Sequence, residues 1–131
     1  MIRLGDSSDD YELRDIGIGG PGDDRIFGMG GSDSMDGQLG TNLLVGGSGA
    51  DQLTSRGGDD RIFAGRGNDS VLGAGGAVEQ LDLGPGNDYA ALGWGPLNVD
   101  CGPGKDEVVI ESTPDPRDRV VDCESVRYVP V

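Results

Sequence analysis

Apolar residues recur along this chain with a period of nine. Cut from Gly19, residues 19–109 divide into ten units, of which the seventh carries one inserted residue. The fourth position is glycine in all ten units: Gly22, Gly31, Gly40, Gly49, Gly58, Gly67, Gly76, Gly86, Gly95 and Gly104. The eighth position is apolar throughout, provided that the insertion in the seventh unit precedes its apolar residue: Ile26, Met35, Leu44, Leu53, Ile62, Val71, Leu81, Ala90, Val99 and Val108. This is the pattern of an internal repeat.

Each unit predicts a glycine-rich turn followed by a short strand. Glycine reaches positive φ at little steric cost, which suits the first positions of the unit. The last three or so residues then form a strand with one side chain pointing inward, as Leu53 does in residues 52–54. Two units make a coil of 18 residues. Stacked coils, about 4.8 Å apart, give an all-β solenoid of two parallel sheets whose eighth positions meet in a thin core.

The composition argues against a conventional globular core. The chain has 131 residues, enough for one small domain, and only 34% of them are hydrophobic while 26 are glycine. Its net charge of −14 favours cations as partners over nucleic acid or an anionic membrane. It contains no apolar run of 18 residues, so we expect no membrane insertion. Without a ligand, such a chain lies close to the disordered class.

Two units, GGPGDDRIF at residues 19–27 and GGSGADQLT at residues 46–54, fit the pattern G-G-x-G-x-D-x-U-x at every position. The sequence therefore resembles the RTX (repeats-in-toxin, hemolysin-type) calcium-binding nonapeptide repeat family over residues 19–109. The resemblance implies a right-handed parallel β-roll with Ca²⁺ between consecutive turns on the same edge. It also implies the ligands: carbonyls of positions two and four and the aspartate of one turn, with carbonyls of positions one and three and the aspartate of the next turn on that edge. Oxygen ligands of this number suit Ca²⁺.

In such a roll, alternate units lie on opposite edges, so the sixth positions form two ladders. The intact edge carries only aspartates: Asp33, Asp51, Asp69, Asp88 and Asp106. The degenerate edge carries Asp24, Asn42 and Asp60, followed by Val78 and Leu97, whose side chains cannot ligate a cation. We expect about four ions on the intact edge, up to about two weaker ones on the degenerate edge, and none beyond Asp60.

The resemblance assigns the ligands residue by residue. On the intact edge the groups are Met29, Gly31 and Asp33 with Gly46, Ser48 and Asp51; Gly47, Gly49 and Asp51 with Ala64, Arg66 and Asp69; Gly65, Gly67 and Asp69 with Leu83, Pro85 and Asp88; and Gly84, Gly86 and Asp88 with Cys101, Pro103 and Asp106. On the degenerate edge, Gly20, Gly22 and Asp24 face Gly37, Leu39 and Asn42. Glycine is replaced at the second position by Met29, Gln38 and Arg56, which questions the local turns but removes no carbonyl ligand.

The ends of the chain do not repeat and are interpreted as caps of the roll, at residues 1–18 and 110–131. Asp15 falls at a sixth position and would add a ligand opposite Asp33, although Leu13 stands where glycine is expected. The C-terminal cap is predicted to contain a strand, a proline-containing loop and a second strand.

Cys101 and Cys123 lie in the last unit and in the C-terminal cap. They either form a disulfide, which would close a loop of about 22 residues and contribute about 3 kcal/mol, or remain free buried thiols. The segment around them is similar to the closing module of many exported bacterial proteins with these repeats. Calcium is plentiful and thiols oxidise outside the cell, so we expect an extracellular protein. No signal peptide follows Met1, and any export signal is expected to lie outside this sequence or to have been removed.

Enzymatic activity is not expected. The chain has no histidine, which removes histidine-based triads and His-containing zinc sites, and two cysteines without histidine make neither a thiol protease nor a zinc site. A carboxylate pair could serve glycoside hydrolysis. The periodic acids, however, are already explained as cation ligands, and a filled roll offers no obvious pocket.

Two functions remain. The first is a calcium-binding module that folds and rigidifies on binding several ions, in a parent enzyme, toxin or adhesin that the sequence does not identify. The second is an adhesin-like, ice-binding or sugar-binding surface that uses the roll as a scaffold. The fifth positions form no regular ladder of Thr or Asn, and only Trp94 and Tyr89 are candidate aromatic platforms for a sugar. Nothing in the sequence indicates an oligomeric state.

Overall fold

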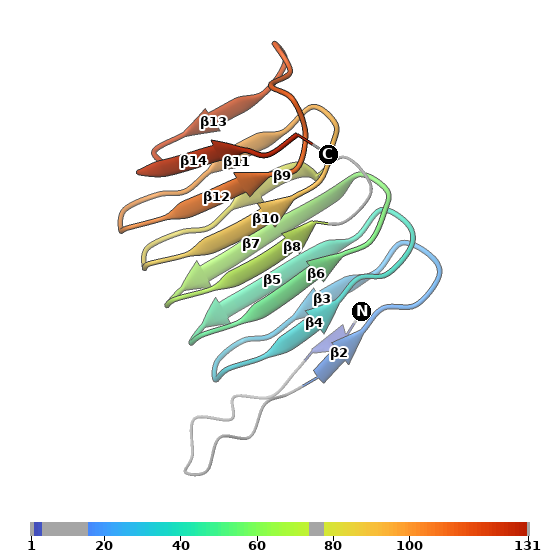
Figure 1. Cartoon of the computed structure of the whole chain (residues 1–131). Coiled ribbons are helices and arrows are strands. Elements are labelled where there is room, and N and C mark those ends of the chain that lie inside the picture. The colour runs from blue at the N-terminus through green and yellow to red at the C-terminus, as the bar shows by residue number, and fades with distance from the viewer. Residues whose placement is uncertain (1, 4–15, 74–77, 131) are drawn as a thin grey trace.

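The chain folds as a β-solenoid (Figure 1). The computed structural model describes residues 2–3, 16–73 and 78–130, and these residues contain strands and no helix. The strands are β1 (Ile2–Arg3), β2 (Ile16–Ile18), β3 (Arg25–Phe27), β4 (Ser34–Asp36), β5 (Leu43–Ser48), β6 (Gln52–Ser55), β7 (Asp60–Arg66), β8 (Ser70–Gly73), β9 (Val78–Asp82), β10 (Tyr89–Leu92), β11 (Asn98–Asp100), β12 (Glu107–Ile110), β13 (Arg119–Val121) and β14 (Ser125–Tyr128).

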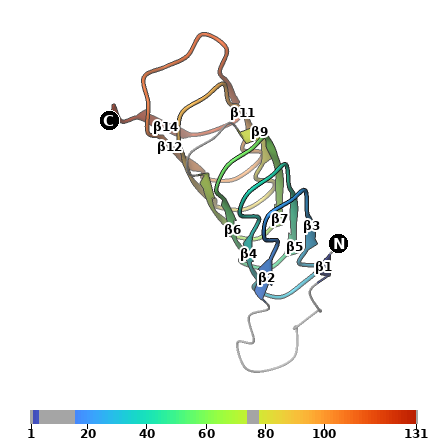
Figure 2. The ribbon, with the colours of Figure 1, turned by 90° about the vertical axis from the view of Figure 1, so that its right-hand side faces the viewer.

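Odd-numbered and even-numbered strands separate into two parallel sheets. One sheet has the order β1-β3-β5-β7-β9-β11-β13, and the other has the order β14-β12-β10-β8-β6-β4-β2. Figure 2 shows the coils stacked along one axis, with one sheet on each side of every coil. The predicted fold class, an all-β solenoid of two parallel sheets with 18 residues per coil, is confirmed.

The register follows the sequence repeat. Leu44 pairs with Ile62, which lies 18 residues later. Ile62 then pairs with Leu81, because the register between β7 and β9 shifts by one next to Asp60 and Arg61. The inserted residue of the seventh unit is therefore absorbed as a β-bulge ahead of Leu81, where the repeat predicted it.

The core is the line of eighth positions, as predicted. All ten of these side chains are at most 1% exposed. The core also contains apolar residues that the period-nine pattern did not single out. They are first-position residues of the later units, one sixth-position residue and the residue that follows the last unit: Ala64, Leu83, Leu92 and Cys101, then Leu97, then Ile110. The earlier units have glycine or serine at their first positions, so the core is wider toward the C-terminal end.

The C-terminal segment adds one strand to each sheet. β13 pairs with β11 and β14 pairs with β12, both in parallel. Val126 in β14 is 38% exposed, so this strand forms the outer end of the solenoid. The N-terminal expectations for Leu13 and Asp15 lie outside the described residues.

Candidate metal centre

The five aspartates of the intact edge lie in one buried row. Each side chain is at most 3% exposed. The backbone N–H of one aspartate donates to Oδ1 of the aspartate in the next coil, over 2.8 to 2.9 Å, and this holds for Asp33 to Asp51, Asp51 to Asp69, Asp69 to Asp88 and Asp88 to Asp106. The stacking of coils thus fixes the aspartates at the sixth position, because each Oδ1 from Asp51 onward is held by a backbone N–H of the preceding turn.

One carboxylate oxygen of each aspartate from the second onward has no protein partner. Within the described residues, Oδ2 of Asp51, Asp69, Asp88 and Asp106 is buried and accepts no hydrogen bond. An ionised carboxylate buried without a partner is costly, by several kcal/mol in typical cases. A row of such oxygens therefore favours a bound cation.

The buried position of these aspartates also raises their pKa values. The pKa of Asp69 is raised to about 7, chiefly by burial and in smaller part by the neighbouring charges of Asp51 and Asp88, against a backbone hydrogen bond that lowers it. Burial likewise raises the pKa of Asp88 to about 6 and raises the pKa of Asp51 and Asp106. A divalent cation between the carboxylates would reverse this effect.

Glycines at the second and fourth positions bring carbonyl oxygens to the same edge. Gly49 and Gly67 have φ of 122° and 130°, and a Cβ atom on Gly67 would overlap the carbonyl oxygen of Gly49 in the coil below. A Cβ atom on Gly65 would overlap the carbonyl oxygen of Gly47 in the same way. The carbonyls of these positions therefore point along the axis of the solenoid into the next turn.

Carbonyls of the first and third positions face the turn below. Gly65 and Gly67 donate their backbone N–H groups to the carbonyl oxygens of Leu83 and Pro85, over 3.2 and 3.1 Å. The same contact joins Gly49 N to Arg66 O (2.9 Å) and Gly86 N to Pro103 O (3.1 Å). A carbonyl oxygen has two lone pairs, so the second pair of each remains available to a cation.

A first-position carbonyl oxygen and the Oδ2 atom of an aspartate also converge. A Cβ atom built on Gly46 would lie 2.6 Å from Oδ2 of Asp51 and would overlap the carbonyl oxygen of Ala64. Gly28 stands in the same relation to Asp33 and to the Gly46 carbonyl. In both cases the two oxygens belong to one predicted ligand group but to successive turns.

The donor set suits a hard cation. Within the described residues no three His, Cys, Asp or Glu side chains form a metal-binding group, so a site on this edge requires backbone carbonyls as well as carboxylates. Oxygen-only coordination is typical of Ca²⁺, whereas Zn²⁺ sites normally contain His or Cys. The stacking brings the two halves of each predicted intact-edge group into neighbouring turns.

The degenerate edge starts in the same way but then differs. The backbone N–H of Asp24 donates to Oδ1 of Asn42 over 2.8 Å, and the buried Oδ2 of Asp24 accepts no hydrogen bond from the part of the chain that the structure describes. A Cβ atom on Gly19 would lie 2.7 Å from both Asp24 Oδ2 and the carbonyl oxygen of Gly37. Asn42, however, donates its Nδ2 to that Gly37 carbonyl over 3.1 Å. An amide N–H therefore stands where an aspartate would offer its second oxygen.

At the next turn of this edge, a serine hydroxyl occupies the second oxygen of the aspartate. Ser55 occupies a first position, and its buried Oγ donates a hydrogen bond to Oδ2 of Asp60, which is fully buried. Asp60 Oδ1 accepts the backbone N–H of Asn42 over 2.6 Å. Both carboxylate oxygens of Asp60 thus have protein partners. Further along, Leu97 belongs to the apolar core, in agreement with the expected loss of ligands.

Within the described residues, three second positions hold a residue other than glycine, and these three turns behave differently. Met29 and Gln38 keep the left-handed conformation of the glycines they replace, with φ of 77° and 62°. In the turn of Arg56, the left-handed conformation of the second position moves to Gly57, with φ of 152°, while the fourth-position Gly58 keeps its positive φ of 89°. The turn thus persists at Met29 and Gln38 at a steric cost and is rearranged at Arg56.

Two further acids extend the ladders and were missed in the sequence. Glu124 Oε2 accepts the backbone N–H of Asp106 over 2.8 Å, and Asp118 Oδ1 accepts that of Leu97 over 3.0 Å. Glu124 lies 18 residues after Asp106, so the repeat spacing could have identified it. Asp118 lies 21 residues after Leu97, off the period, and had no such signal.

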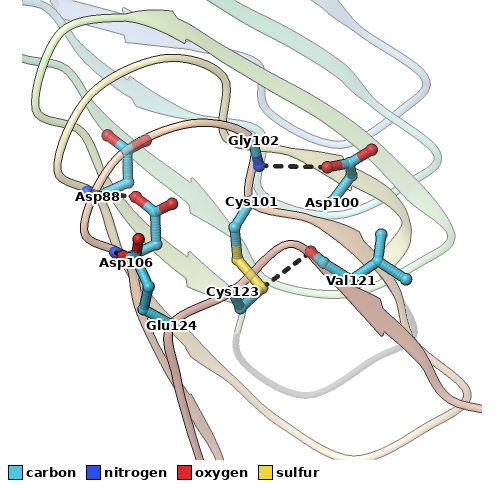
Figure 3. The surroundings of a disulfide bond; sticks show 8 residues. All are labelled: Asp88, Asp100, Cys101, Gly102, Asp106, Val121, Cys123 and Glu124. Atoms are coloured by element: carbon cyan, nitrogen blue, oxygen red, sulfur yellow. Dashed lines mark hydrogen bonds between the residues drawn. A yellow bond between two sulfur atoms is a disulfide. The ribbon is translucent and has the colours of Figure 1, made fainter.

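Cys101 and Cys123 form a disulfide with their Cα atoms 5.1 Å apart (Figure 3). Cys101 is buried in the core, and Cys123 packs against it from the turn between β13 and β14. The last turn of the intact edge is therefore covalently joined to the C-terminal segment.

A comparison with known families agrees with this geometry. The family model described as RTX calcium-binding nonapeptide repeat matches four times, at residues 12–44, 37–71, 45–79 and 56–90, which together span more than half of the chain. The coil continues through β11 and β12, beyond the last match. No curated protein and no solved structure gives a significant match. The described residues hold no helix that could span a bilayer.

Proposed function

The chain belongs to the RTX calcium-binding nonapeptide repeat family, and from that premise we propose that it is a calcium-responsive folding module that works outside the cell. The observation that carries the proposal is the row of buried carboxylates, each of which, from Asp51 to Asp106, has one oxygen without a hydrogen-bond partner among the described residues. Without a cation, these charges repel one another and lack solvation. With Ca²⁺ between them, binding free energy becomes folding free energy.

The balance of charge supports the same conclusion. The chain has a net charge of −14. Ca²⁺ in each of the four intervals of the intact edge would add about eight positive charges, which relieves much of the repulsion that keeps the ligand-free chain expanded. The small hydrophobic share of 34% leaves little else to offset the loss of chain entropy.

We assign the ions unequally to the two edges. The intact edge takes four, held by the carbonyl and carboxylate groups described above. The degenerate edge takes one, between the turns of Asp24 and Asn42, where Asp24 Oδ2 and the Gly37 carbonyl converge. At the Asp60 turn, the Ser55 hydroxyl takes the role of the ion.

The extracellular location rests on two features. The Cys101–Cys123 disulfide is stable in an oxidising compartment, and millimolar Ca²⁺ is available there. The repeats of this family are generally structural, which agrees with the absence of histidine from the sequence. We assign no catalytic role to the chain.

The test is far-UV circular dichroism during a Ca²⁺ titration, with Mg²⁺ as the cation control. We expect a transition from coil to sheet with Ca²⁺ and none with Mg²⁺, because Mg²⁺ demands a smaller octahedral site and retains its water. Asp51→Ala should shift the transition to higher Ca²⁺, whereas Asp59→Ala, which removes an exposed charge, should not. A full sheet signal in excess chelator, unchanged by Ca²⁺, would refute calcium-dependent folding and leave the surface-binding alternative.

A further inference from the structure

The intact ladder does not end at its last repeat. The backbone N–H of Asp106 donates to Oε2 of Glu124 over 2.8 Å, just as the N–H of Asp88 donates to Oδ1 of Asp106 over 2.9 Å. Glu107 pairs with Ser125, so the strands that follow the two acids are in the same register as in the repeats. Glu124 therefore occupies the position that a sixth aspartate would have.

The turn that carries Glu124 is shorter than a repeat turn. Asp100 pairs with Val121 before the turn, and Glu107 pairs with Ser125 after it. Six residues, 101–106, thus face only three, 122–124, which sets the shorter turn back from its neighbour. A glutamate is longer than an aspartate by one methylene, and this length lets Glu124 reach Asp106. Figure 3 shows the two side chains next to each other.

Asp106 offers an oxygen to this junction. Its side chain is 2% exposed, and its Oδ2 accepts no hydrogen bond within the described residues. At Asp51 the corresponding oxygen converges with a carbonyl of the following turn, that of Ala64. For Asp106 the following turn is the one that carries Glu124. By analogy with Asp51, Oδ2 of Asp106 therefore faces the junction between these two turns.

The carbonyls below the junction are arranged as in the repeats. Gly102 and Gly104 have φ of 78° and 143°, within the left-handed range of the glycines whose carbonyls point into the next turn. A Cβ atom on Gly104 would overlap the carbonyl oxygen of Gly86, which places that turn in the regular stack. A surface hollow lies above it, lined by Gly102, Pro103, Asp122, Cys123 and Glu124.

We propose that this junction is an additional Ca²⁺ site, which joins the roll to its C-terminal segment. Oδ2 of Asp106, the carboxylate of Glu124 and the carbonyls of Gly102 and Gly104 are its protein ligands, and water completes the shell. The site rests on the calcium binding proposed above but extends it beyond the nonapeptides. Because Glu124 is exposed, the site is more open to solvent than those between repeats and binds more weakly. The disulfide at Cys123 holds the short turn in place before the ion arrives.

Equilibrium dialysis with radioactive Ca²⁺ tests this proposal on the intact, oxidised chain. Glu124→Gln keeps the acceptor for the Asp106 N–H but removes the charge, and Glu111→Gln removes the charge of another exposed glutamate at the end of β12 as a matched control. We expect Glu124→Gln to bind one ion fewer than the wild type at saturation, or to lose at least tenfold in the weakest binding step. Glu111→Gln should match the wild type.

Three other results would overturn either the additional site or the proposed function. Equal numbers of ions in Glu124→Gln and the wild type, with all affinities within twofold, would overturn the additional site. Loss of every ion in Glu124→Gln would show that Glu124 supports the fold rather than one site, and would overturn it as well. A wild type that binds no Ca²⁺ would instead refute the proposed function itself. Circular dichroism of the same samples identifies which of these cases involves unfolding.

Discussion

The substitution Asp69→Asn should change stability in opposite directions with and without Ca²⁺. Asp69 is in the middle of the intact edge, is 3% exposed, and is flanked by Asp51 and Asp88. An amide is tolerated at a ladder position, because Asn42 accepts a backbone N–H through Oδ1 and donates through Nδ2 to the Gly37 carbonyl. Asn at 69 can make the equivalent contacts while it removes one buried charge.

The magnitude follows from the protonation of Asp69. Burial raises its pKa from 3.8 to about 7 in the folded chain without metal. A pKa difference of about three corresponds to about 4 kcal/mol against folding when the group is ionised, an upper estimate that relaxation reduces. Because the folded-state pKa is raised, this contribution is favourable at low pH and is lost as the pH rises toward 7. Asp69→Asn should therefore make the metal-free fold more stable at pH 8, by about 2 to 4 kcal/mol, with a gain of less than half that size at pH 5 and almost none at pH 3, below the unfolded-state pKa.

With Ca²⁺ present the sign reverses, since two neighbouring sites share Asp69 and each loses a charged ligand. The assay is folding by trimethylamine N-oxide in chelator, which favours compact states, followed by Ca²⁺ titration. Asp69→Asn should lower the osmolyte midpoint at pH 8 and weaken Ca²⁺ binding at least tenfold. Asp59→Asn removes an exposed charge and serves as the control. If Asp69→Asn is less stable than the wild type in chelator, or if Asp59→Asn has the same effects, buried charge at Asp69 is not what opposes folding without metal.

Three further substitutions test individual features, each by urea denaturation of the Ca²⁺-saturated chain. Ser55→Ala removes the donor to the buried Asp60 carboxylate and should lower the free energy of unfolding by about 2 kcal/mol. An unchanged value would show that the Asp60 carboxylate does not depend on the Ser55 hydroxyl. Met29→Gly relieves a non-glycine residue at φ 77° whose side chain is 56% exposed, and should raise the free energy of unfolding by about 0.5–1 kcal/mol; a decrease would mean that the Met29 side chain contributes packing. Replacing Cys101 and Cys123 together by Ser opens a loop with a sequence separation of 22 and should lower the free energy of unfolding. The chain-entropy estimate for that loop is about 3 kcal/mol, and an unchanged value would indicate that the C-terminal segment is held by its strand pairing alone.

Most of the fold could be predicted because its causes are local. A glycine turn and one apolar residue recur within the same nine positions, and stacking follows from the period alone. Even the bulge ahead of Leu81 was visible as an inserted residue. The first-position core residues, such as Leu83 and Leu92, were not predicted. Glycine dominates that position in the earlier units, and because glycine has no side chain, the sequence does not show that the position faces the core.

The sequence did not predict the parts of the site in which a side chain outside the repeat pattern takes the place of a regular ligand. The buried row of aspartates follows from the period, but the hydrogen bond of Ser55 to Asp60 depends on a side-chain direction that the pattern does not contain. Glu124 was overlooked because the last turn is three residues shorter than a repeat turn, which ends the nonapeptide pattern although the spacing of 18 persists. The pattern thus predicts regular ligands, and it fails at the positions where one residue compensates for an irregular turn.

The central claim is that Ca²⁺ lies between successive turns of the intact edge. Crystals grown with Ca²⁺ and measured for anomalous scattering test it most directly. The account predicts a row of four strong peaks, about 4.8 Å apart, beside the aspartates from Asp33 to Asp106. It also predicts one peak between Asp24 and Asn42 and a weaker one beside Glu124. A folded chain with no peaks along the aspartate row, or with equal rows on both edges, would contradict it.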